Sequence, residues 1–573
     1  MTDSPADSRP TTPDTRPQTE IDRIAEQWVV TMAELDPSIA TWIGIPGKLD
    51  EYEDLSPAGH GMYIDEAKKL LALLDSATEV DDVDWVTRTD LSSSIRLDIE
   101  SSEAGLWMRD VNVIESPAQS IRTILDLMPT DTEQNWADIA GRLANLPMAI
   151  EGYIETLRLG IESGVTPAKR QVREVIDQAR KHAAADGFFH GFTAGATLGG
   201  SGRLPDSLSA DLGRGAVVSA AAYDALADFL TDELLPAAQE RDGVGHEIYA
   251  LQSRRFLGAT IDLDETYEWG IEELARMVDE QESIAHEIKP GASVLEAIEI
   301  LDADTSRKLH GAKALQGWMQ QLSDKAVEEL SRSHFDIPDP VKRLECMIAP
   351  THEGGIYYTS PSDDFSRAGR MWWSVPEGVT EFDTWRETTT VYHEGVPGHH
   401  LQLGQAVYNR AKLNTWRRQL AGTSGHAEGW ALYAERLMQD LGYLDDPGDR
   451  LGMLDGQRMR AARVVLDIGV HLGKPRLDGT GVWDWDYALD FMSRNVNMNE
   501  QFVRFEVNRY FGWPGQAPAY KVGQRIWEQI RDQYRAAEGD SFDIKEFHRK
   551  ALDIGGVGLD TLRAALQKPA REH

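Results

Sequence analysis

Apolar residues recur every three or four positions along most of this sequence, from about residue 20 to about residue 335 and again from Asp383 to about residue 568. Residues 21–35, 136–161 and 266–288 show the pattern most clearly. This spacing gathers apolar side chains on one face of a helix, and such a face must pack against another element. The chain is therefore predicted to be mainly α, with antiparallel helices stacked on one another.

A different pattern occupies the segment between about residues 340 and 376, where the short runs RLECMIAP, GIYYTS and RMWWSV are separated by Pro, Gly, Ser and Asp. These runs predict a small β-sheet, followed by a helix for which Asp383 is a suitable N-cap. We interpret GIYYTS as an edge strand. Such a strand could align an extended peptide through backbone hydrogen bonds.

The composition disfavours several classes of protein. A formal net charge of −37 opposes binding to nucleic acid and to anionic membranes, which attract clustered Lys and Arg. No run of eighteen apolar residues occurs and the N-terminus lacks the pattern of a secretory signal, so we expect neither a membrane span nor export, and a cytoplasmic location. Cys346 is the single cysteine, so a bound metal would have to be held by His and carboxylate side chains.

The segment HEGVPGHHLQ places His393 and Glu394 ahead of two further histidines, His399 and His400. In the HExxH motif of zinc enzymes, two histidines four residues apart converge on one ion from the same helical face. In an unbroken helix His399 would be rotated by about 600° from His393 and face away, while His400 would return to that face about 10.5 Å along the axis. Neither spacing suits a regular helix.

A regular helix is not expected here, because Pro397 lacks an N–H and crowds the preceding turn, and Gly395 and Gly398 are costly in a helix interior. We predict that the helix bulges or breaks between 395 and 398. Two residues looped out at this point would bring His399 to the place of the second histidine in HExxH. The alternative is a helix-terminating turn with exposed histidines.

A third ligand is predicted in the segment SGHAEGWALYAERL at 424–437, where Ser424 is a reasonable N-cap of another amphipathic helix. A catalytic zinc site of the His₂Glu type needs one carboxylate and leaves one position for water. Glu428 is our choice, and Glu435, seven residues later on the same face, is the competing ligand. Glu428 could instead be a first-turn acid favoured by the helix dipole.

The segments HEGVPGHHLQ, GHAEGWALYAERL, RAARVVLDIGVH and RYFGWPGQAPAYKVGQ together resemble a bacterial family catalogued as domain of unknown function 885, which is grouped with zinc metallopeptidases of the gluzincin type. The resemblance covers roughly residues 20–565. It implies a large helical metallopeptidase fold with a small β-sheet next to the active-site helix, similar in outline to thimet oligopeptidase and carboxypeptidase Taq. In those relatives a Gly often precedes the second histidine ligand, which favours His399 over His400.

Three regions follow from the pattern and the resemblance together. Residues 1–18 have almost nothing to bury and are predicted to be a disordered tail. Residues 19–335 are expected to form a helical domain that makes one wall of a cleft. Residues 336–573 are expected to form a metallopeptidase-like catalytic region that holds the small sheet and the active-site helices.

The expected chemistry is hydrolysis of short peptides by one Zn²⁺ ion held by His393, His399 and Glu428, with Glu394 as general base. Another divalent metal is possible. For the oxyanion we consider Tyr520 first and His471 second, and the alternative for Tyr520 is a buried structural aromatic. The alternative functions are hydrolysis of non-peptide amides or esters, and a non-catalytic acidic helical scaffold.

Neighbouring residues leave several roles open. Lys521, rather than Tyr520, could face the cleft. Asp467 and His471 are four residues apart on a helix and could form a carboxylate–imidazole pair that orients a ligand, or an ordinary surface pair. His400 is expected beside the ligands or facing substrate, and Arg509 could bind a substrate carboxylate or pair with a neighbouring acid.

Overall fold

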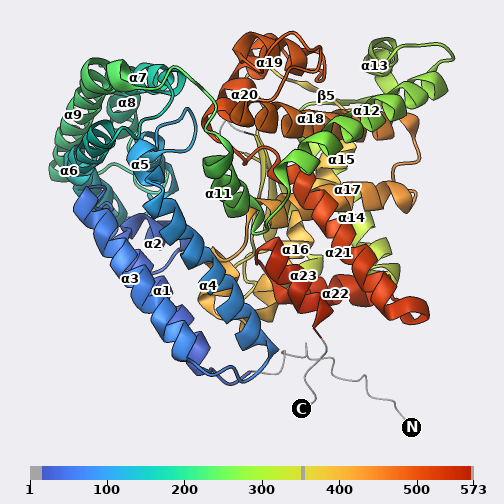
Figure 1. The fold of residues 1–573 in the computed structure, drawn as a ribbon, viewed down its shortest axis with the longest axis horizontal. Coiled ribbons are helices and arrows are strands. Elements are labelled where there is room, and N and C mark those ends of the chain that lie inside the picture. Colours follow the sequence, from blue (N-terminus) through green and yellow to red (C-terminus); the bar gives the residue numbers. More distant parts are fainter. Residues whose placement is uncertain (1–15, 350–354, 569–573) are drawn as a thin grey trace.

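The computed structural model describes residues 16–349 and 355–568, and within these ranges the chain is mainly α as predicted (Figure 1). The helices of the N-terminal part are α1 (Glu20–Leu35), α2 (Pro37–Ile43), α3 (Pro57–Ser76), α4 (Asp82–Glu103), α5 (Pro117–Leu127), α6 (Glu133–Ser163), α7 (Lys169–Ala183), α8 (Phe188–Ala194), α9 (Asp206–Phe229) and α10 (Leu235–Ala237). In Figure 1 they are coloured from blue to green and lie together on one side of the molecule.

The remaining helices lie mainly on the other side of Figure 1. Those that precede the sheet strands β2 to β5 are α11 (His246–Leu257), α12 (Leu263–Ile288), α13 (Val294–Ala303) and α14 (Ala312–Ser333). Those that follow are α15 (Thr384–Glu394), α16 (His399–Tyr408), α17 (Ser424–Asp440), α18 (Pro447–Leu472), α19 (Trp485–Ser493), α20 (Glu500–Gly512), α21 (Ala519–Glu538), α22 (Ile544–Ile554) and α23 (Leu559–Gln567).

The predicted sheet is present, and its three strands coincide with the three short runs. The strands are β2 (Leu344–Ile348), β3 (Ile356–Thr359) and β4 (Gly369–Trp373), in the order β2-β4-β3, with β2 parallel and β3 antiparallel to β4. The side chain of Gln316 on α14 donates to the Cys346 carbonyl at 2.8 Å and so covers the free edge of β2. β3 is the other edge strand of this sheet, as predicted for GIYYTS. Strands β1 (Lys308–His310) and β5 (Glu381–Asp383) form a separate antiparallel pair.

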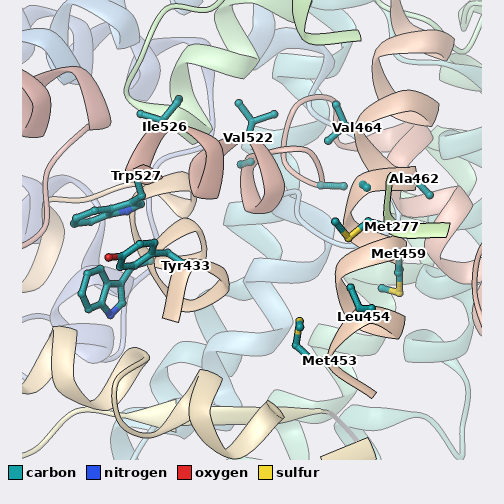
Figure 2. Close-up of a cluster of buried hydrophobic side chains, with 14 of the residues drawn as sticks. Met277, Tyr433, Met453, Leu454, Met459, Ala462, Val464, Val522, Ile526 and Trp527 are labelled. Carbon is teal, nitrogen blue, oxygen red and sulfur yellow. The ribbon is translucent and has the colours of Figure 1, made fainter. Parts of the chain in front are cut away.

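A large hydrophobic core joins the central and C-terminal helices. In this core α12 packs along α18, and α17 packs along α21. Figure 2 shows part of it, with Met277 of α12, Tyr433 of α17, Leu454 of α18 and Trp527 of α21 among the buried side chains. A separate core fills the group formed by α5 to α9. Helices α12, α17, α18 and α21 carry most of the polar residues described below. The packing of these four helices therefore positions the candidate site.

Close contact between α17 and α21 depends on two facing glycines. A Cβ atom on Gly429 would lie 2.4 Å from the carbonyl carbon of Gly523, which is too close for any side chain. The two backbones therefore approach to a distance that only glycine permits. This contact fixes α17, the helix that carries Glu428 and Glu435, against α21, which carries Tyr520.

Two observations bear on the ends of the predicted regions. Most of the predicted tail, residues 1–15, lies outside the described residues, but Arg16 forms ion pairs with Asp22, Asp81 and Asp84 and belongs to the folded body. Composition does not reveal such pairing, because it depends on acids far along the chain. The core around the candidate site includes Val86 of α4 and extends from Tyr249 into α23, so the boundary expected at residue 335 falls inside one packed unit.

Candidate metal centre

The helix that begins at Thr384 ends at Glu394, and a new helix begins at His399, so the predicted interruption at 395–398 is present. The amide of Gly395 donates to the Val391 carbonyl at 2.9 Å, and the amide of Gly398 donates to the Tyr392 carbonyl at 3.1 Å. The indole of Trp430 on α17 donates to the carbonyl of Pro397 at 2.8 Å. The loop is therefore tied to the helix that follows it in the site.

Gly398 is the residue that makes this loop compact. A Cβ atom at this position would lie 1.9 Å from the carbonyl oxygen of His393 and 2.5 Å from that of Tyr392. No other residue fits without moving the backbone of α15 or the loop. The first residue after this tight contact is His399, which explains how two histidines six positions apart can face one another.

The side chains of His393, His399 and Glu428 converge, and one potential ligand atom from each lies within 4.8 Å of the others. Nε2 of His393 is 3.3 Å and Nε2 of His399 is 3.7 Å from the same carboxylate oxygen of Glu428. Ligand atoms around a tetrahedral zinc ion with bonds of about 2.0–2.1 Å lie about 3.3 Å apart. Two imidazoles and one carboxylate at these separations fit a single zinc ion. The donor set is also compatible with other divalent metals.

Burial differs among the three side chains. His393 is 8% exposed and His399 12%, whereas Glu428 is 23% exposed. The histidines are thus held in the protein interior, and solvent reaches the cluster beside Glu428. A centre that is open on one side suits a catalytic metal, because a catalytic ion needs a position for water or substrate.

Glu435, the competing ligand in the sequence prediction, lies on the other side of His393. Its carboxylate accepts a hydrogen bond from Nδ1 of His393 at 2.7 Å, which leaves Nε2 of the ring directed toward Glu428. Metal-binding histidines commonly make such a bond to a carboxylate, which sets the tautomer and the ring orientation. Glu435 is therefore placed to orient a ligand rather than to be one.

A buried polar chain supports Glu435, and sequence reasoning missed part of it. Gln457 on α18 donates to the second carboxylate oxygen of Glu435 at 2.9 Å. The Gln457 oxygen accepts from Nζ of Lys521 at 2.7 Å, and Lys521 also pairs with Glu273 of α12 at 3.0 Å. Lys521 is 1% exposed and does not face a cleft. Nothing in a single sequence marks a buried glutamine as the partner of a distant glutamate.

The electrostatics of the cluster favour positive charge at its centre. Burial by itself lowers the pKa of His393, but hydrogen bonds and charge from Glu428 and Glu435 outweigh this effect and raise it to about 10. Burial raises the pKa of Glu428, yet its contacts with His393 and His399 bring it well below the usual range. The protein thus holds a proton where a metal cation would lie, and a bound metal would displace that proton.

His400 points away from the cluster. It is 1% exposed, its Nε2 donates to the Val341 carbonyl at 2.7 Å, and its Nδ1 accepts from the Tyr358 hydroxyl at 2.9 Å. Burial lowers its pKa to about 4, so the ring is neutral. His400 therefore joins α16 to the edge strand β3, and the expectation that it adjoins the ligands or faces substrate does not match these contacts.

Glu394 follows His393 directly and is the last residue of α15. Its side chain is largely buried but forms no hydrogen bond or ion pair with any residue in the described part of the chain. A buried carboxylate without a partner is costly unless it has a functional use. Its position beside a ligand and its free oxygens are what a general base requires.

Tyr520 lies near the start of α21, within the electrostatic range of Glu428. The negative charge of Glu428 and burial together raise the pKa of the Tyr520 phenol, so the hydroxyl stays protonated. Its ring is 5.3 Å from the guanidinium carbon of Arg463 and 5.8 Å from that of Arg460. Tyr520 is thus brought to the side of the centre where Glu428 lies.

His471, the second candidate for the oxyanion, is not brought to the centre. It is fully buried and its Nε2 donates to the Tyr510 carbonyl at 2.8 Å. It follows Gln457 by 14 residues on α18, which places it about 21 Å further along the helix. Asp467 does not pair with it, because its carboxylate accepts from the Tyr249 hydroxyl at 2.6 Å and from the Gly515 amide at 3.0 Å.

Two further sequence predictions concern the N-cap of α17 and the partner of Arg509. The helix carrying Glu428 begins at Ser424 as a helical residue, and its N-cap is Thr423, whose hydroxyl accepts from the His426 amide at 3.2 Å. Arg509 pairs with Glu506 at 3.3 Å and donates to the Gln516 side chain at 3.2 Å, in line with the second of its two predicted roles.

Comparison with known proteins agrees on the fold and leaves activity open. Two solved structures cover 96% of this chain: a Colwellia psychrerythraea protein described as a putative lipoprotein (22% identity, TM-score 0.80, 98% of that chain) and a Shewanella oneidensis protein described as a putative lipoprotein of unknown function (16% identity, TM-score 0.74, 100% of that chain). No curated protein matches this chain. Residues 37–566 match the family described as "Bacterial protein of unknown function (DUF885)". The chain therefore belongs to the DUF885 family of bacterial proteins.

Proposed function

We propose that this protein is a zinc-dependent metallopeptidase of the gluzincin type that hydrolyses short peptides. The observation that carries the proposal is the convergence of His393, His399 and Glu428 across an interrupted helix. Glu394, a buried carboxylate without a partner among the described residues, stands directly beside the first of these ligands. A purely structural metal site has no use for such a group.

Each group has a defined part in the proposed reaction. His393, His399 and Glu428 would hold the zinc ion, which would supply a Lewis acid able to lower the pKa of water and polarise a substrate carbonyl. Glu394 accepts a proton from the attacking water as the new C–O bond forms. It then delivers this proton to the leaving nitrogen as the C–N bond breaks, which yields a carboxylic acid and an amine.

Tyr520 is the proposed donor to the carbonyl oxygen while negative charge develops there. Its hydroxyl stays protonated because its pKa is raised, and α21 holds it on the Glu428 side of the centre. A fixed donor at this place stabilises the oxyanion more than the neutral carbonyl. His471 is not retained in this role, because it is fully buried elsewhere on α18.

The edge strand β3 is the proposed support for an extended substrate. Tyr358 of β3 is bonded to His400, the residue that follows the ligand His399, so the strand adjoins the helix of the centre. A peptide that pairs with β3 would gain backbone hydrogen bonds independent of its side chains.

The test is a comparison of the wild-type protein with a Glu394→Gln variant, in metal content and in hydrolysis of a panel of short peptides and small amides. We expect one zinc per chain in both proteins and a loss of turnover of about 10²–10⁴-fold in the variant. Glu377→Gln, which changes an exposed glutamate, serves as the control and should keep full turnover.

Loss of zinc in Glu394→Gln, or unchanged turnover, would contradict the assigned role. Activity restricted to non-peptide amides or esters would favour the alternative hydrolase, since activated water does not dictate the acyl group. A wild-type protein that holds zinc and hydrolyses none of the panel would favour the non-catalytic alternative.

A further inference from the structure

Arg460 on α18 lies near the candidate centre and has no described carboxylate in direct contact with it. The chain contains 95 Asp and Glu against 58 Lys and Arg, so an arginine has many potential partners. Arg460 nevertheless forms no hydrogen bond or ion pair with any residue in the described ranges, and its Nε atom is buried without an acceptor. A partly buried guanidinium left in this condition loses hydration without gaining a partner.

Arg460 is close to two residues that adjoin the centre, Gln457 and Tyr520. It follows Gln457, the partner of Glu435, by one helical turn, and its charge contributes to lowering the pKa of Glu435. Its guanidinium carbon lies 5.8 Å from the ring centre of Tyr520, the phenol that senses the charge of Glu428. Arg460 thus lies beside Tyr520 and within the electrostatic range of Glu435.

The guanidinium has room in this place because the preceding turn has no side chain there. A Cβ atom on Gly456 would lie 2.6 Å from one terminal nitrogen of Arg460. Side chains on a helix lean toward its N-terminus, and the arginine therefore folds back over Gly456. The fold supplies space for the planar group, but no described carboxylate lies within hydrogen-bond or ion-pair distance of it.

The other two arginines around Tyr520, Arg463 and Arg509, share the carboxylate of Glu506. Arg463 donates to the carboxylate of Glu506 at 2.7 Å and to the Tyr510 hydroxyl at 2.7 Å. Arg509 pairs with the other oxygen of Glu506. Of the three arginines described around this ring, Arg460 alone has no carboxylate within ion-pair distance.

We propose that Arg460 binds the free C-terminal carboxylate of a short peptide, so that this centre acts close to the C-terminus of its substrate. Arginine is suited to this role because its planar donors match a carboxylate in a bidentate geometry. The inference rests on the proposed peptidase function and narrows its substrate class to peptides with an unblocked C-terminus.

Binding is tested in zinc-loaded full-length protein carrying Glu394→Gln, which removes turnover. The probes are the N-acetylated tripeptide of alanine as the free acid and as the C-terminal amide, with affinities measured by calorimetry. A charge-assisted hydrogen bond at a partly buried site is worth about 1.5–3 kcal/mol, so we expect the acid to bind about 10- to 100-fold more tightly. Adding Arg460→Gln should abolish this preference.

Arg458→Gln is the matched control, because it removes the same charge from the same helix. Arg458 donates to Gln281 at 2.9 Å and to Asn495 at 3.0 Å, on a different face of α18. The control should keep the preference for the free acid. Melting temperatures of the three proteins show that each is folded before affinities are compared.

Equal affinity for acid and amide, binding of neither, or a preference that persists in Arg460→Gln would overturn the inference. A preference that depends on Arg460, together with no hydrolysis by the wild-type protein, would overturn the peptidase function and leave the carboxylate site standing. Hydrolysis of the free acid and the amide at equal rates would overturn the carboxylate site and leave the peptidase function standing.

Discussion

At the scale of single residues, His399 and His400 show how adjacent side chains take different tasks. The helix that starts at His399 turns consecutive residues by about 100°, so the two rings cannot share an environment. His399 faces Glu428, while His400 bonds the Val341 carbonyl and the Tyr358 hydroxyl. One histidine belongs to the candidate metal centre and the other to the contact between α16 and the sheet.

This division predicts opposite effects of two alanine substitutions. His399→Ala should lose zinc and lower the free energy of unfolding of the metal-free protein by only about 1 kcal/mol, because Nδ1 of His399 has no partner among the described residues and Nε2 approaches Glu428 only to 3.7 Å. His400→Ala should leave two buried groups unpaired and lower that free energy by about 3 kcal/mol. Metal analysis and chemical denaturation with chelator measure the two effects. Loss of zinc in a stably folded His400→Ala protein would contradict the assignment.

The residues that the sequence could predict are those whose spacing carries a geometric meaning. His393, Glu394 and His399 follow from a motif interrupted by Pro and Gly, and Glu428 follows from its place in the next helix. The role of Glu435 and the position of His471 could not be predicted. Glu435 shares a helical face with Glu428, and only the packing of α15 on α17 decides which of the two carboxylates meets which nitrogen of His393.

At the scale of elements, the break between α15 and α16 is the feature on which the centre depends. Pro397 and the two glycines predict the break, since each disfavours a continuous helix. The sequence could not predict its shape, because the loop is held by Trp430, which lies 33 residues from Pro397. The local sequence interrupts the helix, and a distant side chain determines where the chain resumes.

Gly398→Ala is expected to disturb this element. Its Cβ atom would lie 1.9 Å from the His393 carbonyl oxygen, so the loop or the end of α15 must move, which displaces His393 relative to His399. We expect zinc affinity to fall by at least about tenfold, in line with other changes that disturb ligand orientation. Competition with a chromophoric chelator measures the affinity.

Gly317→Ala is the control for this change. It lies in α14, and a Cβ atom there would meet nothing within 4 Å. Alanine should stabilise the helix by about 0.5–1 kcal/mol and leave zinc affinity unchanged. If Gly398→Ala binds zinc as tightly as Gly317→Ala, the compact loop is not what brings the histidines together.

At the scale of the whole molecule, one core surrounds the candidate centre. It joins helices from α11 to α23 and includes Val86 of α4, so the site is supported by segments that are far apart in the sequence. Helical periodicity predicted most of these helices, but not the order in which they pack. None of the described helices combines the length and the apolar character that a membrane-spanning helix requires.

Buried neutral histidines in this core predict a loss of stability in acid. Burial lowers the pKa of His548 to about 3, and its Nε2 accepts from the Tyr433 hydroxyl at 2.9 Å. The unfolded chain binds a proton at this residue near pH 6.5, so its contribution to stability is present above that pH and is lost as the pH falls toward 3. Below about pH 6 the loss approaches about 1.4 kcal/mol per pH unit.

Chemical denaturation of the metal-free protein at pH 7, 6 and 5 measures this effect. His548→Gln should show a smaller decrease in the free energy of unfolding over this range than the wild type. His310→Gln, at an exposed histidine of β1, should follow the wild type. An unchanged pH dependence in His548→Gln would mean that this ring is not held in its neutral form.

The central claim is that an interrupted helix lets two histidines six positions apart hold one metal ion with a distant glutamate. Anomalous diffraction at the zinc edge, from crystals of the protein purified with zinc, tests it most directly. The claim predicts one peak about 2.0–2.2 Å from Nε2 of His393, Nε2 of His399 and the carboxylate of Glu428. No peak at this position, or a peak coordinated by His400 or Glu435 in place of these residues, would contradict it.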